Sequence, residues 1–273
     1  MLSALVSDPI STAFAKGATT YQAYLRSPHG RLRLEVIWHQ LLGFMEKAWG
    51  ADRRPLQVLD IGCGPGELSL RLAARGHAVV LLDPVEEMLR LAVETARALE
   101  APPVIPPRFV HGSLEEAHGL FGNSTFDLLL CHALLEYLPD PRSALHPLRT
   151  LLTPGGFLSL VAVKRWQEVL RLAIRDGKLD EARRALAGDA PMDSLFGLPR
   201  NGVVTDHVQA QLEAAGIDLI AHAGVFVFAD YLPAGRLEDP AYFPALLRLE
   251  LEAGSLAPFR EVARYLHLWG RRA

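Results

Sequence analysis

Cysteine is scarce in this sequence: its 273 residues include only Cys63 and Cys131. Two cysteines so far apart provide neither a disulfide framework nor the CxxC spacing of a metal site, so no bound metal is expected. So few cysteines are typical of a reducing compartment, and we therefore expect the protein in the cytoplasm. Residues 1–14 lack a positively charged start and a long apolar core, which argues against a signal peptide.

Long hydrophobic runs and an excess of positive charge are also absent. No apolar run approaches the roughly 20 residues that a membrane-spanning helix needs, so no membrane span is expected. The net charge of −3 excludes a globally basic nucleic-acid-binding protein, although it does not exclude a local basic patch. Half of the residues are hydrophobic, which suffices for the core of one large domain, with or without an added segment.

The middle of the chain alternates two kinds of pattern. Short apolar segments, typical of strands buried on both faces, occupy 56–62, 78–83, 127–133 and 156–163. Between them lie 140–156 and two stretches with helical apolar spacing, 66–76 and 84–101. Repeated β-α-β units of this kind predict a parallel sheet with helices on both faces.

The segments before and after this region also show helix and strand patterns. Residues 10–50 are predicted to be helical, and 164–187 to form a helical insertion. Residues 202–232 indicate a helix followed by a strand. Near the C-terminus, alternating side chains predict a final strand that contains Tyr265, His267 and Trp269.

A glycine-rich turn follows the first predicted strand, in the sequence VLDIGCGPG. Asp60 lies near the end of that strand. Gly62, Gly64 and Gly66 let the backbone bend sharply and approach a ligand without an intervening side chain. Ligands of open parallel sheets bind outside the carboxyl ends of the strands, so this loop is predicted to hold one. A dinucleotide site would need G-x-G-x-x-G, but Glu67 occupies the third glycine position.

This G-x-G-x-G spacing behind an acidic residue resembles motif I of the class I S-adenosylmethionine-dependent methyltransferases. Asp83, at the end of the next strand, matches the carboxylate that accepts hydrogen bonds from both ribose hydroxyls of the donor. Residues 109–116, 126–141 and 151–160 resemble the segments that surround the adenine and lead into the next strands. The resemblance implies an α/β, Rossmann-like fold: a central, mostly parallel seven-stranded sheet flanked by helices, with N-terminal helices and a helical insertion after the fifth strand.

Further segments resemble the tRNA 5-carboxymethoxyuridine methyltransferase family over most of the chain, most weakly over 164–200. They are 30–42, 131–145, 224–232 and 246–268. The resemblance implies that Arg33 binds the carboxylate of the donor, which its planar guanidinium suits. Together with the loop, the predicted set of donor-binding residues is Arg33, Asp60, Gly62, Cys63, Gly64, Gly66, Asp83, Ser113, Leu114 and His132.

Four segments follow from these assignments. We expect an N-terminal helical segment over the cofactor site at 1–50 and an S-adenosylmethionine-binding, Rossmann-like core at 51–163. Residues 164–202 are expected to form the helical insertion, a candidate lid, and 203–273 the C-terminal part of the sheet.

The acceptor side offers fewer motifs. Arg200 lies in the turn-forming sequence LPRNG, so its side chain is expected to be free to reach into the cleft and orient the acceptor. Tyr231 and Tyr265 are candidates for stacking on a splayed RNA base, with core aromatics on strands as an equal alternative.

Basic residues on the insertion bear on whether the acceptor is tRNA. The family carries a lysine cluster between the fifth strand and the next helix, whereas the matching segment here, 185–197, has two Asp and no Lys. The basic side chains lie earlier, in 164–184, where a solvated helix face is the alternative interpretation. The candidates for contacts with tRNA phosphates are Arg171, Arg175, Lys178, Arg264, Arg271 and Arg272.

We therefore expect a methyltransferase that uses S-adenosylmethionine and an oxygen nucleophile. If the narrower resemblance holds, the acceptor is the carboxylate of 5-carboxymethoxyuridine at a tRNA wobble position, and the product is a methyl ester. A carboxylate is ionised near neutral pH, so no general base is needed. The alternatives are a small-molecule O- or N-methyltransferase of the same fold and a protein that binds the donor without turnover.

Overall fold

The computed structural model describes residues 8–50, 54–138, 140–193, 195–233 and 235–273. Residues 1–7, part of the segment predicted not to be a signal peptide, lie outside the described residues, as do 51–53 at the predicted start of the core. Within the described ranges, none of the helices is long and apolar enough to cross a membrane.

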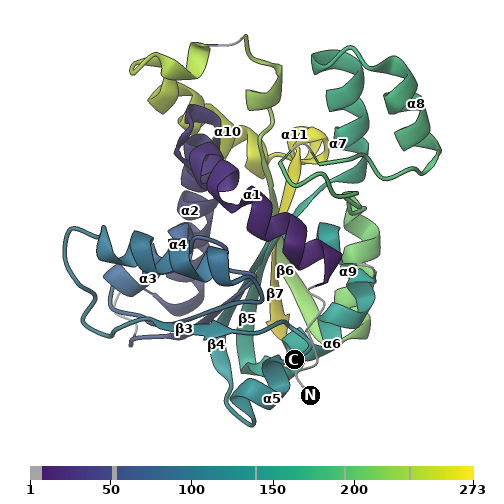
Figure 1. The fold of residues 1–273 in the computed structure, drawn as a ribbon. Helices are drawn as coiled ribbons and strands as arrows, with labels where there is room; N and C mark the ends of the chain where they lie inside the picture. Colours follow the sequence, from purple (N-terminus) through teal and green to yellow (C-terminus); the bar gives the residue numbers. More distant parts are fainter. Residues whose placement is uncertain (1–7, 51–53, 139, 194, 234) are drawn as a thin grey trace, which may run out of the picture.

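One sheet of seven strands forms the centre of the molecule (Figure 1). The strands are β1 Gln57–Ile61, β2 Ala78–Asp83, β3 Arg108–His111, β4 Phe126–His132, β5 Leu152–Val163, β6 Ile217–Val225 and β7 Tyr265–Arg272. Their order is β3-β2-β1-β4-β5-β7-β6. β1 to β5 are parallel, whereas β7 pairs antiparallel with both β5 and β6. The predicted mostly parallel, seven-stranded sheet is confirmed.

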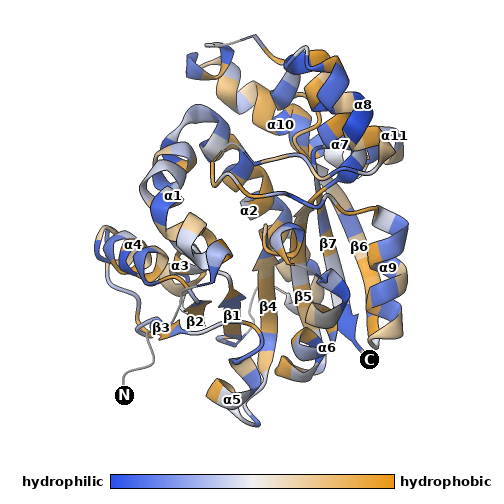
Figure 2. Cartoon of the chain, turned by 45° about the vertical axis from the view of Figure 1, so that its right-hand side comes forward, coloured by the Kyte–Doolittle hydropathy of each residue, from blue (hydrophilic) through white to orange (hydrophobic). Residues whose placement is uncertain are grey.

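Helices cover both faces of this sheet (Figure 1). Apolar side chains of α2 (Pro28–Trp49), α3 (Glu67–Ala74) and α4 (Glu86–Arg97) pack on one face. Those of α5 (Ala117–Phe121), α6 (Pro141–Leu151) and α9 (Thr205–Ala214) pack on the other. The central strands are almost wholly apolar because they are buried on both sides (Figure 2).

The predicted N-terminal helices are confirmed, and two of them lie before β1 in the described residues. α1 (Pro9–Arg26) begins after Asp8, whose carboxylate accepts a hydrogen bond from the N–H of Ser11. α2 begins after Ser27, whose hydroxyl oxygen accepts one from the N–H of Gly30. The two helices contact each other, and α1 also contacts α4. α1 thereby lies across the carboxyl ends of the parallel strands (Figure 1).

The insertion after β5 is helical, as predicted. It consists of α7 (Arg165–Leu170), a π-helical turn (Arg171–Arg175) and α8 (Leu179–Ala187). Two helices that the patterns did not predict follow β6, namely α10 (Tyr242–Ser255) and α11 (Ala257–Val262). β5 begins at Leu152 rather than at 156. Short 3-10 turns occupy Leu135–Tyr137, Ala229–Tyr231 and Arg236–Glu238.

Candidate active site

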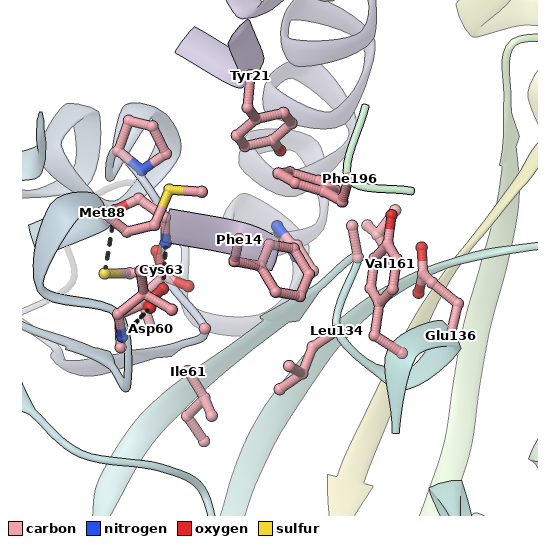
Figure 3. Close-up of a pocket in the computed structure, with 18 of the residues that line it drawn as sticks. Phe14, Tyr21, Asp60, Ile61, Cys63, Met88, Leu134, Glu136, Val161 and Phe196 are labelled. Carbon is pink, nitrogen blue, oxygen red and sulfur yellow. Dashed lines mark hydrogen bonds between the residues drawn. The ribbon is translucent and has the colours of Figure 1, made fainter. Parts of the chain in front are cut away.

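A cavity of about 650 Å³ opens at the carboxyl ends of β1, β2 and β4 (Figure 3). Its walls come from the loops after these strands, from α1 and α2, and from Asp193, Leu195, Phe196 and Arg200, which follow α8. The predicted donor-binding residues all line it: Arg33, Asp60, Gly62, Cys63, Gly64, Gly66, Asp83, Ser113, Leu114 and His132. The structure therefore brings the whole predicted set together, although their individual roles stay predictions.

The glycine loop has a backbone shape that requires glycine. The φ angles of Gly62, Gly64 and Gly66 are +67°, +53° and +74°, in the left-handed region. A Cβ on Gly66 would also lie 2.6 Å from Cδ2 of Leu81. The loop thus presents bare backbone to the cavity.

Asp83, at the end of the neighbouring strand β2, binds the backbone of this loop. Its Oδ2 accepts a hydrogen bond of 2.8 Å from the N–H of Gly64, and its Oδ1 accepts one of 2.9 Å from the N–H of Val85. Burial raises the pKa of Asp83 to about 6, and these two donors limit the rise. Burial also raises the pKa of Asp60 to about 7. Each Asp83 oxygen keeps a further lone pair for a ligand hydroxyl.

Arg33 is a buried cation without a carboxylate partner among the described residues. Its Nη2 donates a hydrogen bond of 2.9 Å to the hydroxyl oxygen of Tyr21, and its Nε has no hydrogen-bond partner. The guanidinium carbon lies 5.2 Å from the ring centre of Tyr24 and 5.6 Å from that of Tyr265. A buried cation held by aromatic rings rather than by an anion is prepared to bind an anionic ligand.

Aromatic side chains from three separate segments meet over the cavity, and sequence patterns did not reveal them. The rings of Phe14 and Phe196 have centroids 4.3 Å apart, and Phe14 meets Tyr137 at 5.0 Å. Tyr21 lies 5.5 Å from Phe196. Figure 3 shows Phe14 and Phe196 side by side above the strand ends. The four rings give the cavity an apolar cover.

Arg200 lines the cavity, but the expectation that its side chain is free is wrong. It is buried, with Nη1 2.9 Å from Oδ2 of Asp193 and Nη2 2.8 Å from Oε2 of Glu168. Burial raises the pKa of Glu168, but the guanidinium groups of Arg200, Arg264 and Arg171 outweigh it and lower that pKa to about 2. The turn-like sequence did not reveal this pairing. Glu168 is 32 residues away in the sequence, and Asp193 lies before the turn.

The basic residues predicted to contact tRNA phosphates are largely engaged in ion pairs within the protein. Arg171 pairs with Glu168 and Asp176, and Arg175 pairs with Asp176 and Asp230. The remaining candidates are also occupied: Lys178 pairs with Glu181, Arg264 with Asp230, and Arg271 and Arg272 donate to backbone carbonyls. The basic character of 164–184 in the sequence is thus mostly neutralised in the fold.

The two tyrosine candidates differ in position. Tyr231 does not line the cavity, and its hydroxyl oxygen accepts a hydrogen bond of 2.5 Å from Gln167. Tyr265 does line it, but its ring is 3% exposed and lies against the guanidinium groups of Arg33 and Arg264. Tyr265 therefore acts as a support for these cations in this structure.

Glu136 is a further cavity residue that the sequence did not single out. It is buried, and its Oε2 has no hydrogen-bond partner in the part of the chain that the structure describes. Burial raises its pKa to about 7, with Arg200 and Arg33 among the groups that oppose the rise. A carboxyl group shortly after β4, in the 3-10 turn Leu135–Tyr137, was the only available signal. Across the described part of the chain, no group of three or more His, Cys, Asp or Glu could hold a metal ion.

Comparisons with known proteins agree with this geometry. Residues 58–156 match a family model described as a methyltransferase domain. The chain is similar to a SAM-dependent methyltransferase structure from Thermotoga maritima, a possible histamine N-methyltransferase, with a TM-score of 0.61 and 13% identity over 97% of this chain and 100% of that one. This likeness shows the fold.

Two curated relatives extend the comparison. A ubiquinone biosynthesis O-methyltransferase from Azotobacter vinelandii is 37% identical over 118 residues, which cover 43% of this chain and 49% of the relative. The tRNA 5-carboxymethoxyuridine methyltransferase of Escherichia coli K12 is 30% identical over 250 residues, 89% of each chain. With the glycine loop, Asp83 and the buried Arg33 in one cavity, the chain belongs to the class I S-adenosylmethionine-dependent methyltransferases and, within them, to the tRNA 5-carboxymethoxyuridine methyltransferase family.

Proposed function

We propose that this enzyme transfers the methyl group of S-adenosylmethionine to the carboxylate of 5-carboxymethoxyuridine in tRNA and forms a methyl ester. The observation that carries the proposal is Arg200, a buried arginine that lines the same cavity as the glycine loop. An arginine fork suits a carboxylate acceptor. The similarity to the Escherichia coli enzyme along most of both chains supports the same acceptor.

The residues of the donor half fit S-adenosylmethionine. The open backbone at Gly62 and Gly64 leaves room for the nucleoside, and Asp83 has lone pairs for the ribose hydroxyls. Arg33, which has no carboxylate partner among the described residues, would bind the carboxylate of the methionine end. When bound, the donor supplies an electrophilic methyl group on a sulfonium.

The chain's own contribution is orientation and exclusion of water. An acceptor carboxylate is already ionised near neutral pH, so the site has no proton to remove. Arg200 shares its charge with Glu168 and Asp193. It would therefore orient the acceptor without pairing so tightly that the carboxylate loses nucleophilicity. The cover formed by Phe14 and Phe196 would keep water from the reacting atoms.

Two exposed arginines on α8, Arg183 and Arg184, would provide contacts with tRNA phosphates. Neither has an ion pair among the described residues, unlike Arg171 and Arg175 nearby. Phosphate contacts release counterions, so methylation of tRNA should then weaken steeply as salt rises.

The test measures transfer of labelled methyl groups to two tRNA samples. One carries 5-carboxymethoxyuridine and the other lacks it. We expect an ester product only on the modified tRNA. Arg200→Lys should lower kcat/KM about tenfold, because an ammonium does not reproduce the planar fork of the guanidinium, and should leave the affinity for S-adenosylhomocysteine unchanged. Full activity of Arg200→Lys would remove Arg200 from acceptor binding.

A matched pair of charge reversals tests the tRNA surface. Arg183→Glu with Arg184→Glu should raise KM for tRNA and flatten its dependence on salt. The control, Arg97→Glu with Arg108→Glu, reverses two exposed arginines on α4 and β3, away from the insertion (Figure 1), and should change neither. Equal effects of both pairs would show that net charge, not this surface, governs the result.

A small-molecule acceptor is the second candidate. It is favoured by the internal pairing of Arg171, Arg175 and Lys178, which leaves the insertion with few free cations. An enzyme of this kind would methylate small carboxylates or phenols with a flat salt profile, and neither pair of charge reversals would matter.

A further inference from the structure

A continuous line of hydrogen bonds runs from the cavity through the sheet to α2. Nε2 of His132, at the end of β4, lies 2.9 Å from Oγ of Ser159 on β5. The same Oγ lies 2.9 Å from Nε2 of His267 on β7. Nδ1 of His267 lies 2.8 Å from Oε1 of Gln40, and Nε2 of Gln40 donates to the carbonyl oxygen of Gly224 at 2.9 Å.

The direction of every hydrogen bond in this line follows from its far end. The carbonyl of Gly224 can only accept, so the Gln40 amide must turn its NH₂ toward it and its oxygen toward His267. His267 therefore carries its proton on Nδ1, and its Nε2 must accept from the hydroxyl of Ser159. That hydroxyl has one proton, so its oxygen accepts from Nε2–H of His132.

This assignment requires both imidazoles to be neutral. Burial lowers the pKa of His132 to about 3, with a further decrease from Arg33. Burial likewise lowers the pKa of His267 well below its usual range, as does His132. A neutral His132 with its proton on Nε2 has a lone pair on Nδ1. That nitrogen has no hydrogen-bond partner among the described residues, and the ring lines the cavity.

We propose that Gln40, His267 and Ser159 are positioning residues that fix His132 as a hydrogen-bond acceptor, whose Nδ1 receives an N–H of the donor's ammonium group. The methionine end of the donor carries both charges and needs a cation and an acceptor side by side. Arg33 supplies the cation in the same cavity, without a competing carboxylate among the described residues. With the other tautomer, an N–H of His132 would face the ammonium.

The glycine at 254 makes the far end of the line possible. A Cβ there would lie 2.4 Å from the carbonyl oxygen of Gly224 and 3.5 Å from Nε2 of Gln40. Four strands and two helices thus contribute to the orientation of one ring, although only His132 belongs to the cavity wall among the four linked side chains.

The direct test is nitrogen NMR of the ligand-free protein with labelled histidine, the His132 signals being assigned by their loss in His132→Gln. We expect Nε2 of His132 to be protonated and Nδ1 to be unprotonated near neutral pH. Ser159→Ala removes the acceptor of Nε2–H and should shift the ring toward the Nδ1–H tautomer. Gln40→Leu should act in the same direction through His267.

Binding provides an independent readout that needs no methyl acceptor. Ser159→Ala and Gln40→Leu should weaken S-adenosylhomocysteine about three- to tenfold, the scale of one hydrogen bond. Both should leave methylthioadenosine, which lacks the amino-acid end, unchanged. The control Thr205→Val removes a buried hydroxyl that has no hydrogen-bond partner within the described ranges, and it should alter neither ligand.

Two results would overturn the proposal. One is a wild-type His132 with its proton on Nδ1. The other is equal weakening of S-adenosylhomocysteine and methylthioadenosine in Ser159→Ala and Gln40→Leu, which would indicate general damage to the cavity. Neither depends on which acceptor the enzyme uses, so failure here is distinct from failure of the tRNA assignment.

Discussion

The hydroxyl oxygen of Tyr21 accepts a hydrogen bond of 2.9 Å from Nη2 of Arg33, which joins α1 to α2 inside the cavity. The same ring lies 3.6 Å from the Cβ position of Gly64 and 5.5 Å from the ring of Phe196. Tyr21 therefore contacts Arg33, the glycine loop and the aromatic cover at once.

Removal of the Tyr21 hydroxyl tests whether this hydrogen bond positions Arg33. Tyr21→Phe keeps the ring but leaves Nη2 of Arg33 without its acceptor, so we expect S-adenosylhomocysteine to bind about three- to tenfold more weakly. The matched control is Tyr231→Phe, which also removes a hydrogen-bonded hydroxyl but lies outside the cavity lining. Calorimetric titration should show a change only for Tyr21→Phe; identical affinities in both variants would show that the hydroxyl does not position Arg33.

Asp83 should make donor binding depend on pH. Its folded-state pKa is raised to about 6, and the ionised form is the better acceptor for ribose hydroxyls. Affinity for S-adenosylhomocysteine should therefore fall as pH decreases below about 6. The folding stability of the ligand-free protein should depend on pH in the opposite sense. Because the pKa of Asp83 is raised on folding, Asp83 contributes less stability as pH rises from about 4 through about 6.

Ligand titrations between pH 5 and 8 would check the binding statement, and denaturant unfolding from about pH 4 to about pH 7 would check the stability statement. Asp83→Asn should bind more weakly and lose this pH dependence. Asp60, whose pKa is raised to about 7, is the other carboxyl to exclude, and Asp60→Asn should retain the dependence. A flat profile in the wild type would contradict the role of Asp83.

Gly66 should be far less tolerant of alanine than Gly76, although both have positive φ. Gly66→Ala places a Cβ 2.6 Å from Leu81, whereas nothing lies within 4 Å of a Cβ at Gly76. We expect Gly76→Ala to cost about 1–2 kcal/mol of unfolding free energy for the left-handed backbone alone. Gly66→Ala should cost about 1–3 kcal/mol more, because the added methyl group overpacks the core. Denaturant unfolding would measure both; equal losses would contradict the close approach.

Glu168 should be the carboxylate on which the insertion most depends. Its side chain is 2% exposed and lies between Arg200, Arg264 and Arg171. Glu168→Gln leaves buried cations undercompensated, so we expect a loss of about 3–5 kcal/mol in unfolding free energy.

The contribution of Glu168 to stability should also depend on pH in the acid range. The folded-state pKa of Glu168 is lowered to about 2, so its contribution is full above its ordinary pKa of 4.5 and is lost as pH falls from about 4.5 toward 2. The difference in unfolding free energy between wild type and Glu168→Gln should shrink over that interval. A constant difference would contradict the ion pairing.

The parts of this fold that could be predicted from sequence are those with a local cause. Buried strands are apolar runs, and the loop at Gly62 needs glycine because its φ is positive. Arg200 was expected to be free because its neighbours are turn residues, but its two carboxylate partners meet it only in the folded chain. Phe196 and Phe14 likewise have no common pattern in sequence. Such contacts follow from topology, which no local motif encodes.

The position of β7 has a consequence for how the enzyme is made. β7 lies between β5 and β6, and it brings Tyr265 against Arg33 and His267 against Ser159. A nascent chain on the ribosome therefore exposes the glycine loop and Asp83 long before the residues that support Arg33 and His132 have been synthesised. Until Trp269 has emerged, the edge of β5 is unpaired and the cavity lacks the residues that β7 contributes. Cofactor binding during translation should begin only with the last strand.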